Sequence, residues 1–338
     1  MNSKDILRDL SRGIAFERHA FRDALELMTS DAASAPQKAA FLALLRGRGE
    51  TVAEITGAAE LLRERMVTLR APAGAVDIVG TGGDGHGTYN ISTAAAFVVA
   101  GCGVPVAKHG NRAVSSKSGA SDVLAALGVK LEVAPAVVER AISQAGVGFV
   151  WAPLHHPLMK AWGPVRAELG IRTIFNLLGP VCNPAGVKRQ VVGVFDQFWI
   201  APVAEVLRNL GSEHVWVVHG ADGLDELTTT GVTHGAELRN GQIRAFRVQP
   251  EDAGLGRAKL ADLAGGDAAH NALALRGVLA GETGAYRDIV LLNAAAALIV
   301  AGRAADLKAG VGQAMAAIAS GKAQASLDNL IRITNESK

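Results

Sequence analysis

The chain has 338 residues, of which 39 are glycine and 11 are proline, and the glycines follow no G-X-Y period. Because average glycine usage is about 7% and low-complexity chains carry ~25–30% Pro plus Gly, this composition excludes collagen and disorder. The formal net charge of +2 excludes an overall field that attracts nucleic acid, so any anion-binding site has to be local.

The remaining composition predicts a cytoplasmic protein with one large domain and a smaller one, since 49% of the residues are hydrophobic. The two cysteines, Cys102 and Cys182, fit a reducing compartment and not a disulfide framework. Residues 1–21 mix both charges and lack the apolar core of a signal peptide. The apolar stretches at 91–107 and 289–302 are interrupted or too short to cross a bilayer, so we expect no membrane contact.

Residues 4–70 are predicted to be helical throughout, because apolar residues such as Ile6, Leu7 and Leu10 recur at helical spacing and none alternates with period two. Residues 71–74, with Pro72, form a candidate linker. We therefore expect a helical domain at 1–70 and an α/β domain at 75–338.

From residue 75 onward, strands and helices alternate. Apolar runs predict strands at 75–79, 104–107, 129–133, 147–151, 190–195 and 214–218, and helical patterns occupy 92–100, 121–127, 135–145 and 199–210. This rhythm is typical of an α/β fold with a mostly parallel sheet. Asn240-Gly241 predicts a local antiparallel hairpin, and the chain from Asp267 to the end is helical and alanine-rich.

A glycine cluster follows the first predicted strand, with five glycines among residues 80–87. Gly80-x-Gly82-x-x-Gly85 matches the dinucleotide fingerprint, but that site also needs an acidic residue about 20 positions on, and residues 85–121 contain none. No Gly-Lys-Ser/Thr follows either, which excludes a Walker loop. A backbone anion site ahead of a helix near Ser92 remains, with a plain strand-to-helix turn as the alternative.

The acid-free stretch itself is cationic and rich in hydroxyls. It contains three Lys or Arg, two His and three further Ser side chains, namely Lys108, Arg112, Lys117, His86, His109, Ser115, Ser116 and Ser118. Taken alone these residues fit a solvated loop. Next to the glycine turn they favour a ligand with several phosphates.

Three carboxylates, Asp222, Asp225 and Glu226, follow the strand predicted at 214–218. Ligands bind at the carboxyl ends of strands in open α/β sheets, and Mg²⁺ commonly takes one or two carboxylates plus substrate phosphates. An ordinary acidic turn is the alternative for this segment on its own. Combined with a phosphate site, the pair Asp225 and Glu226 predicts a magnesium site.

Other candidate groups are less informative. His155-His156-Pro157 lacks further ligands at zinc spacing, so we expect a pocket-lining or structurally hydrogen-bonded histidine there. Arg166 either binds a carboxylate through two hydrogen bonds or lies on the surface of a helix. No nucleophile elbow and no activated cysteine is present, so covalent catalysis has no support.

Several long motifs resemble the anthranilate phosphoribosyltransferase family, and they extend over nearly the whole chain. They are Gly80-Thr81-Gly82-Gly83-Asp84, Asn90-Ile91-Ser92-Thr93, Lys108 to Ser116, His155-His156-Pro157, Arg172 to Pro180, His219 to Glu226, Gly265-Gly266-Asp267 and Leu291 to Ala295. The resemblance implies transfer of the phosphoribosyl group of phosphoribosyl diphosphate (PRPP) to the amine of anthranilate, with release of pyrophosphate, in tryptophan biosynthesis. It also implies Mg²⁺, a homodimer joined through the helical domain, and part of 166–186 joining that domain.

The resemblance assigns roles residue by residue. PRPP contacts are implied at Gly80, Gly83, Asp84, Thr88, Asn90, Ile91, Ser92, Thr93, Lys108, Gly110, Asn111, Arg112, Ser115, Ser116 and Ala120. Anthranilate contacts are implied at Gly80, His109, Asn111, His156 and Arg166, and metal contacts at Ser92, Asp225 and Glu226. Lys108, Arg166, Asp225 and Glu226 are the expected catalytic groups.

The chain departs from the family at Gly119-Ala120-Ser121-Asp122, where Gly-Ser-Ala-Asp is common. The hydroxyl expected at position 120 is absent, and a helical Ser121 would point about 100° away, which leaves the Ala120 N–H as the phosphate donor. Two alternatives remain. A pyrimidine nucleoside phosphorylase would be expected to carry an Asp-Lys-His-Ser-Thr-Gly-Gly motif, which is missing, and a nucleic-acid-binding paralogue would be expected to lose the glycine or acidic motif.

Overall fold

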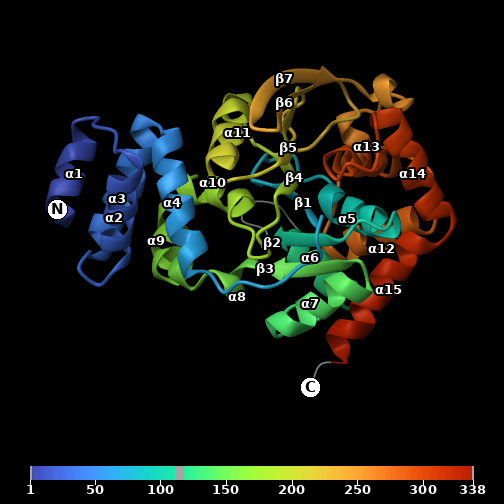
Figure 1. Ribbon diagram of the computed structural model, residues 1–338, viewed down its shortest axis with the longest axis horizontal. Coiled ribbons are helices and arrows are strands. Elements are labelled where there is room, and N and C mark those ends of the chain that lie inside the picture. Colours follow the sequence, from blue (N-terminus) through green and yellow to red (C-terminus); the bar gives the residue numbers. More distant parts are fainter. Residues whose placement is uncertain (1, 112–117, 337–338) are drawn as a thin grey trace.

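The computed structural model describes residues 2–111 and 118–336, and it consists of a small helical part and a large α/β part (Figure 1). The small part begins with α1 (Ser3–Ser11), α2 (Arg18–Thr29), α3 (Ala35–Arg48) and α4 (Val52–Arg65). Asn2, Ser34 and Thr51 start three of these helices with reciprocal capping boxes, which satisfy the first free N–H groups of each helix.

The chain returns to the helical part between the third and fourth strands, through α8 (Ala152–His155), α9 (Gly163–Leu169) and α10 (Ile174–Val181). Trp162, just before α9, is fully buried, with its ring centroid 5.9 Å from that of Phe41 and 5.1 Å from that of Phe175. Its indole N–H donates to Thr29 Oγ1 at 3.0 Å. These contacts join α9 and α10 to the core of α2 and α3.

The large part is built on one seven-stranded sheet in the order β3-β2-β1-β4-β5-β6-β7. The strands are β1 (Val76–Gly80), β2 (Val106–Gly110), β3 (Val147–Trp151), β4 (Arg189–Gly193), β5 (His214–Gly220), β6 (Thr233–Arg239) and β7 (Gln242–Val248). The first five strands are parallel, and β6 and β7 are antiparallel. Asn240 and Gly241 both have positive φ, as the hairpin turn between β6 and β7 requires.

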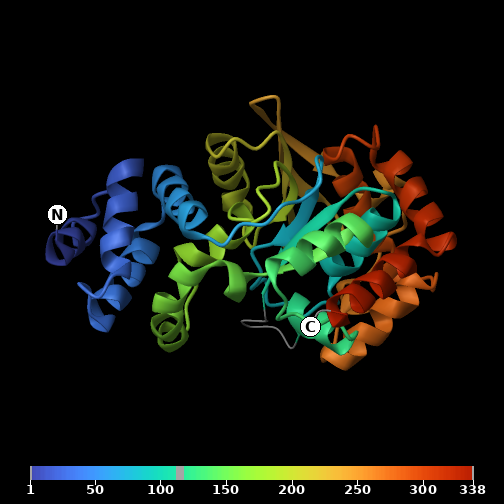
Figure 2. The ribbon, with the colours of Figure 1, turned by 60° about the horizontal axis from the view of Figure 1, so that its bottom comes forward.

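Helices cover both faces of the sheet (Figures 1 and 2). One face packs on α5 (Ile91–Gly101), α6 (Ala120–Ala126), α7 (Pro135–Gln144) and the C-terminal helices α12 (Ala268–Leu279), α13 (Ala285–Val300), α14 (Leu307–Ala319) and α15 (Lys322–Asn335). The other face packs on α11 (Ile200–Asn209) and continues into the helical core. Strand residues alternate between these two cores: Ile78 joins the first and Val79 the second.

The expected combination of a small helical domain with a large α/β domain and a mostly parallel sheet is confirmed. The strand predicted at 129–133 is wrong. The Lys130 N–H donates to Thr334 Oγ1 of α15 at 3.2 Å, and Asn335 donates at 2.9 Å to the oxygen of Gly128, just before the segment, so the C-terminal helix takes contacts that a neighbouring strand would make. In the described part of the chain, no helix is long and apolar enough to cross a membrane.

Candidate functional site

The candidate site lies at the carboxyl edge of the parallel strands. The glycine-rich loop, residues 81–90, runs from the end of β1 to the start of α5. β1 has β2 on one side and β4 on the other, so the strand order changes direction at β1. Ligands of open α/β sheets bind in the crevice at such a point.

Two glycines make room for the acidic residues at this crevice. Gly80 of β1 and Gly193 of β4 lie opposite each other in the ladder. A Cβ on Gly80 would lie 2.3 Å from Asp225 Oδ2, and one on Gly193 would lie 1.5 Å from the Asp225 backbone oxygen. Asp225 therefore rests directly on the ends of both strands, and its Oδ2 accepts the Gly82 N–H at 2.6 Å. The contact of Gly193 was not predicted, because it pairs residues far apart in the sequence.

The acidic loop that carries Asp225 and Glu226, residues 221–227, is held on both sides. Asp222 Oδ2 accepts the hydroxyls of Thr228 and Thr230, each at 2.6 Å. Asn293 of α13 accepts the Leu227 N–H at 3.1 Å and donates to Leu227 O at 2.9 Å. The sequence shows Asn293 only as part of a resembling motif, whereas the structure shows that it fixes the backbone next to Glu226.

The carboxylates at this site are strongly perturbed. Burial, with the charge of Asp84 adding to it, raises the pKa of Asp225 to about 7. Burial and the neighbouring Asp225 raise the pKa of Glu226 to about 8. The Asp84 carboxyl also lies within hydrogen-bond reach of Asp225. Two buried carboxylates thus lie next to each other with the charge of Asp84 nearby, and a cation would offset their mutual repulsion.

Oxygen ligands of this kind fit a hard divalent cation such as Mg²⁺. Among residues 2–111 and 118–336, no three His, Cys, Asp or Glu side chains gather in a metal-holding group. A cation held by Asp225 and Glu226 alone would need water or substrate oxygens to complete its coordination, as Mg²⁺ commonly does. The histidine pair at 155–156 gives no such oxygen site.

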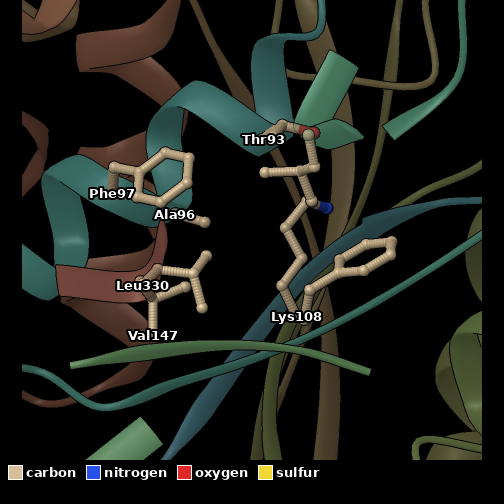
Figure 3. A pocket seen from close by; sticks show the side chains of 8 residues that line it. Thr93, Ala96, Phe97, Lys108, Val147 and Leu330 are labelled. Atoms are coloured by element: carbon tan, nitrogen blue, oxygen red, sulfur yellow. The ribbon is translucent and has the colours of Figure 1, made fainter. Parts of the chain in front are cut away.

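Lys108 lies beneath the glycine-rich loop. It is 3% exposed, and its Nζ donates to Ile78 O at 2.8 Å and to Ser92 Oγ at 3.2 Å. Burial lowers the pKa of Lys108, while the charges of Asp77, Glu226 and Asp225 oppose that effect. Figure 3 shows the lysine chain extending from β2 toward the first turn of α5, beside a small cavity lined by Thr93, Ala96 and Phe97.

The start of α5 is fixed by residues from the C-terminal half. Thr88 forms an isolated bridge with Ala264. Asn90 accepts from Asn271 Nδ2 at 3.0 Å and donates to Ser118 O at 3.3 Å, which ties the helix start to the segment before α6. Ile91, Ser92 and Thr93 then form the first helical turn, in which the Ile91 N–H donates to Tyr89 O at 2.9 Å and the Ser92 N–H bonds the Glu226 carboxyl.

His109 and His156 form a buried neutral pair. His109 Nδ1 lies 3.0 Å from Gly179 O, so it carries the proton, and His109 Nε2 accepts from His156 Nε2 at 3.2 Å. Burial lowers the pKa of His109 to about 3 and that of His156 to about 4, and a neighbouring histidine adds to each shift. His155 instead bonds Val67 O at 2.7 Å, which is a structural contact.

Three further predicted residues lie on α9, at the end of β2 and directly after it. Arg166 lies half-buried on α9, with its guanidinium carbon 5.4 Å from the centroid of the Phe175 ring. Gly110 ends β2 against the Phe149 ring, where a Cβ would lie 2.7 Å from a ring carbon. Asn111 accepts the Ser121 N–H through its backbone oxygen at 3.4 Å. The predicted contacts at Arg112, Ser115 and Ser116 lie outside the described residues.

Ala120 is the first residue of α6, with Gly119 as the N-cap. Ser121 is fully buried, and its hydroxyl has no hydrogen-bond partner among the described residues.

Arg172 is a residue of this site that sequence reasoning did not assign. It donates to Gly83 O, and its guanidinium carbon lies 4.3 Å from the centroid of the Phe195 ring. It thereby connects the segment between α9 and α10 to the glycine-rich loop. Its place in the motif Arg172 to Pro180 was the one signal that could have pointed to it.

Comparisons with known proteins agree with this geometry. Residues 4–66 match the helical bundle domain of a glycosyl transferase family, and residues 72–324 match the α/β domain of that family. An anthranilate phosphoribosyltransferase of Rhodopseudomonas palustris is 59% identical over 331 residues, which cover 98% of both chains.

Two solved structures are similar over nearly their full length. The anthranilate phosphoribosyltransferase of Thermus thermophilus superposes with a TM-score of 0.92 at 43% identity, covering 98% of this chain and 99% of the other. The enzyme of Saccharomyces cerevisiae, solved in complex with PRPP and Mg, gives 0.89 at 28% identity and covers 98% of each chain.

Proposed function

Because this chain belongs to the anthranilate phosphoribosyltransferase family, we propose that its site binds PRPP and anthranilate and joins them with release of pyrophosphate. The observation that carries the proposal is the contact between the acidic loop and the glycine-rich loop. Asp225 accepts the Gly82 N–H where Gly80 and Gly193 end their strands. This contact brings the proposed cation site next to the proposed backbone anion site, as a magnesium diphosphate requires.

The proposed PRPP contacts surround this junction. The N–H groups of the glycine-rich loop and the first turn of α5 face the diphosphate, together with Asp84, Thr88, Asn90 and Ser92. Lys108 supplies the buried positive charge near Ser92. At the start of α6, the Ala120 N–H is the donor, since the side chain offers none. Gly110, Asn111, Arg112, Ser115 and Ser116 are proposed to continue the phosphate site.

The proposed acceptor site lies on the helical side. Asn111, His109 and His156 line it, and Arg166 binds the anthranilate carboxylate as a charge-assisted pair. The neutral histidine pair suits an aromatic ring, because neither imidazole brings a charge into the pocket. The amine is thereby directed at the ribose.

In the proposed reaction, the bond between ribose C1 and the diphosphate oxygen breaks, and the amine nitrogen forms the new bond to C1. The leaving diphosphate takes the bonding electron pair, and the amine proton passes to water or to pyrophosphate. Lys108 and the loop N–H groups stabilise the negative charge that develops on the leaving group. When bound by Ser92, Asp225 and Glu226, Mg²⁺ supplies further positive charge for the same purpose.

We propose the same assembly and compartment as for the resembling family, a cytoplasmic homodimer joined through the helical domain. The contacts of Trp162 and Phe175 support the proposal that part of 166–186 belongs with 1–70 in that domain, with 75–338 otherwise forming the α/β domain. Light scattering of the purified chain tests the dimer.

The activity is tested by following anthranilate fluorescence with purified chain, PRPP and Mg²⁺. The proposal expects fluorescence to fall only when all components are present. Phosphorolysis of a pyrimidine nucleoside, or retention on nucleic acid, without loss of anthranilate would contradict it.

A further inference from the structure

The two central strands β1 and β2 separate just below the site. Their only registered pair is Val76 with Val106, whereas β1–β4 and β2–β3 are each paired at five positions. If the parallel ladder continued, the Ile78 N–H would donate to Ala107 O and the His109 N–H would donate to Ile78 O. Ile78 O, Ala107 O and the His109 N–H instead find side-chain partners.

Three side chains occupy the gap. Asp77 Oδ1 accepts the His109 N–H at 3.1 Å, and Lys108 Nζ donates to Ile78 O at 2.8 Å. Asn183, from the turn between α10 and β4, donates to Ala107 O at 2.8 Å and to Asp77 Oδ2 at 2.8 Å. Asp77, Lys108 and Asn183 are each no more than 4% exposed, so water does not replace these bonds.

The opening of the ladder determines where Lys108 ends. In a closed ladder, Lys108 Nζ would have to share Ile78 O with the His109 N–H, which would compete for its position. With Asp77 holding the His109 N–H instead, Ile78 O is free to accept from Lys108 Nζ, which also reaches Ser92 Oγ at the start of α5. The same shift places His109 where its ring meets Gly179 O and His156.

We propose that Asp77 and Asn183 are positioning residues for phosphoribosyl transfer, which hold β1 and β2 apart and so aim Lys108 and His109 at the substrates. This inference rests on the proposed function. Asp77 and Asn183 act through these neighbours and touch neither substrate. Asp77 has to be acceptor-only, because the His109 N–H and the Asn183 amide both donate to it.

The test exchanges carboxylate and amide groups at positions 77 and 183. Asp77→Asn puts an NH₂ group against a donor, whichever way the amide turns. The exchanged pair Asp77→Asn/Asn183→Asp restores one donor–acceptor contact between the two side chains. Glu54→Gln is the matched control, since Glu54 is also a fully buried carboxylate that accepts a backbone N–H, from Phe16 in the helical part.

We expect Asp77→Asn to lower kcat at least tenfold, with the exchanged pair recovering at least a third of the loss on a logarithmic scale. Glu54→Gln should leave kcat within twofold of wild type. If Asp77→Asn does not fold, Asn183→Ala carries the same prediction, with a fall of at least fivefold. A kcat within twofold of wild type, or an exchanged pair no better than Asp77→Asn, overturns the proposal.

A second readout needs no substrate. In Asn183→Ala, the amide of His109 should exchange with solvent at least fivefold faster than in wild type, while the amides of β3 stay unchanged. Unaltered exchange at His109 contradicts the inference even if the enzyme is active. An inactive wild-type chain with the expected exchange pattern contradicts the proposed function instead.

Discussion

At the scale of single residues, the site depends on what is missing from some positions as much as on what is present at others. Gly80 and Gly193 matter because no side chain fills the space that Asp225 occupies. Motif spacing predicted Gly80 and the acidic pair. It did not predict the contacts of Gly193 and Arg172, since these join segments that are distant in the chain, although Arg172 stands within one of the resembling motifs.

The acidic pair gives the first prediction. Asp225→Asn/Glu226→Gln should lower kcat by roughly 100-fold or more, because amides bind Mg²⁺ less well and remove its charge stabilisation of the leaving group. Activity should be measured over a Mg²⁺ titration, with circular dichroism to check the fold. Near-normal turnover at saturating Mg²⁺ would refute the metal assignment.

Gly193 gives a second prediction, which rests on the lack of room for a side chain at this position. In Gly193→Ala the new Cβ would lie 1.5 Å from the Asp225 backbone oxygen, so the acidic loop has to move. We expect at least a tenfold rise in the Mg²⁺ concentration needed for half-maximal activity. Gly312→Ala is the control, since nothing lies within 4 Å of a Cβ there, and it should behave like wild type.

Arg166 gives the third prediction. Loss of a charge-assisted hydrogen bond costs about 1.5–3 kcal/mol, so Arg166→Ala should raise the KM of anthranilate roughly 10- to 100-fold. The KM of PRPP should change far less. Initial rates with each substrate varied in turn separate the two constants, and the opposite order would exclude the proposed role.

At the scale of elements, the sequence predicted the alternation of strands and helices well, because each parallel strand is an apolar run ended by a turn. The segment 129–133 is the exception, because it was predicted as a strand and forms none. Val129, Leu131 and Val133 alternate like a strand, but the segment bonds to side chains of α15 and pairs with no strand. Apolar alternation reports burial on one side and does not reveal which partner provides it.

The contact between the end of β2 and the segment after α8 makes stability depend on pH. The pKa of His109 falls from its usual 6.5 to about 3 in the fold, so the unfolded chain binds its proton first as the pH drops. The stability that this histidine provides is present above pH 6.5 and is lost as the pH falls toward 3. We expect the free energy of unfolding to drop by roughly 2 kcal/mol between pH 7 and pH 5 from His109 alone.

Urea unfolding of wild type and His109→Asn at both pH values checks this prediction. The variant should lose less stability on acidification than wild type, whatever its absolute stability. His19→Asn, at an exposed position of α2, should keep the wild-type slope. Equal slopes for wild type and His109→Asn would contradict the assignment of a buried neutral imidazole.

At the scale of the whole molecule, the site draws on both parts of the chain. The sheet edge supplies the glycine-rich loop, Lys108 and the acidic loop, and the segment between β3 and α10 supplies His156, Arg166 and Arg172. The two-domain order follows from the change of apolar periodicity near residue 71. The packing of α9 and α10 against the helical part is not visible in the apolar periodicity of the sequence. These two helices are short, and single residues such as Trp162 and Phe175 make the contact.

The central claim is that one chain couples anthranilate to PRPP at this edge. Its most direct measurement is the ratio of pyrophosphate released to anthranilate consumed in the presence of Mg²⁺. The account predicts a ratio of about one for wild type and no release of pyrophosphate without anthranilate. Pyrophosphate release that does not depend on anthranilate, or anthranilate consumption without it, would contradict the claim.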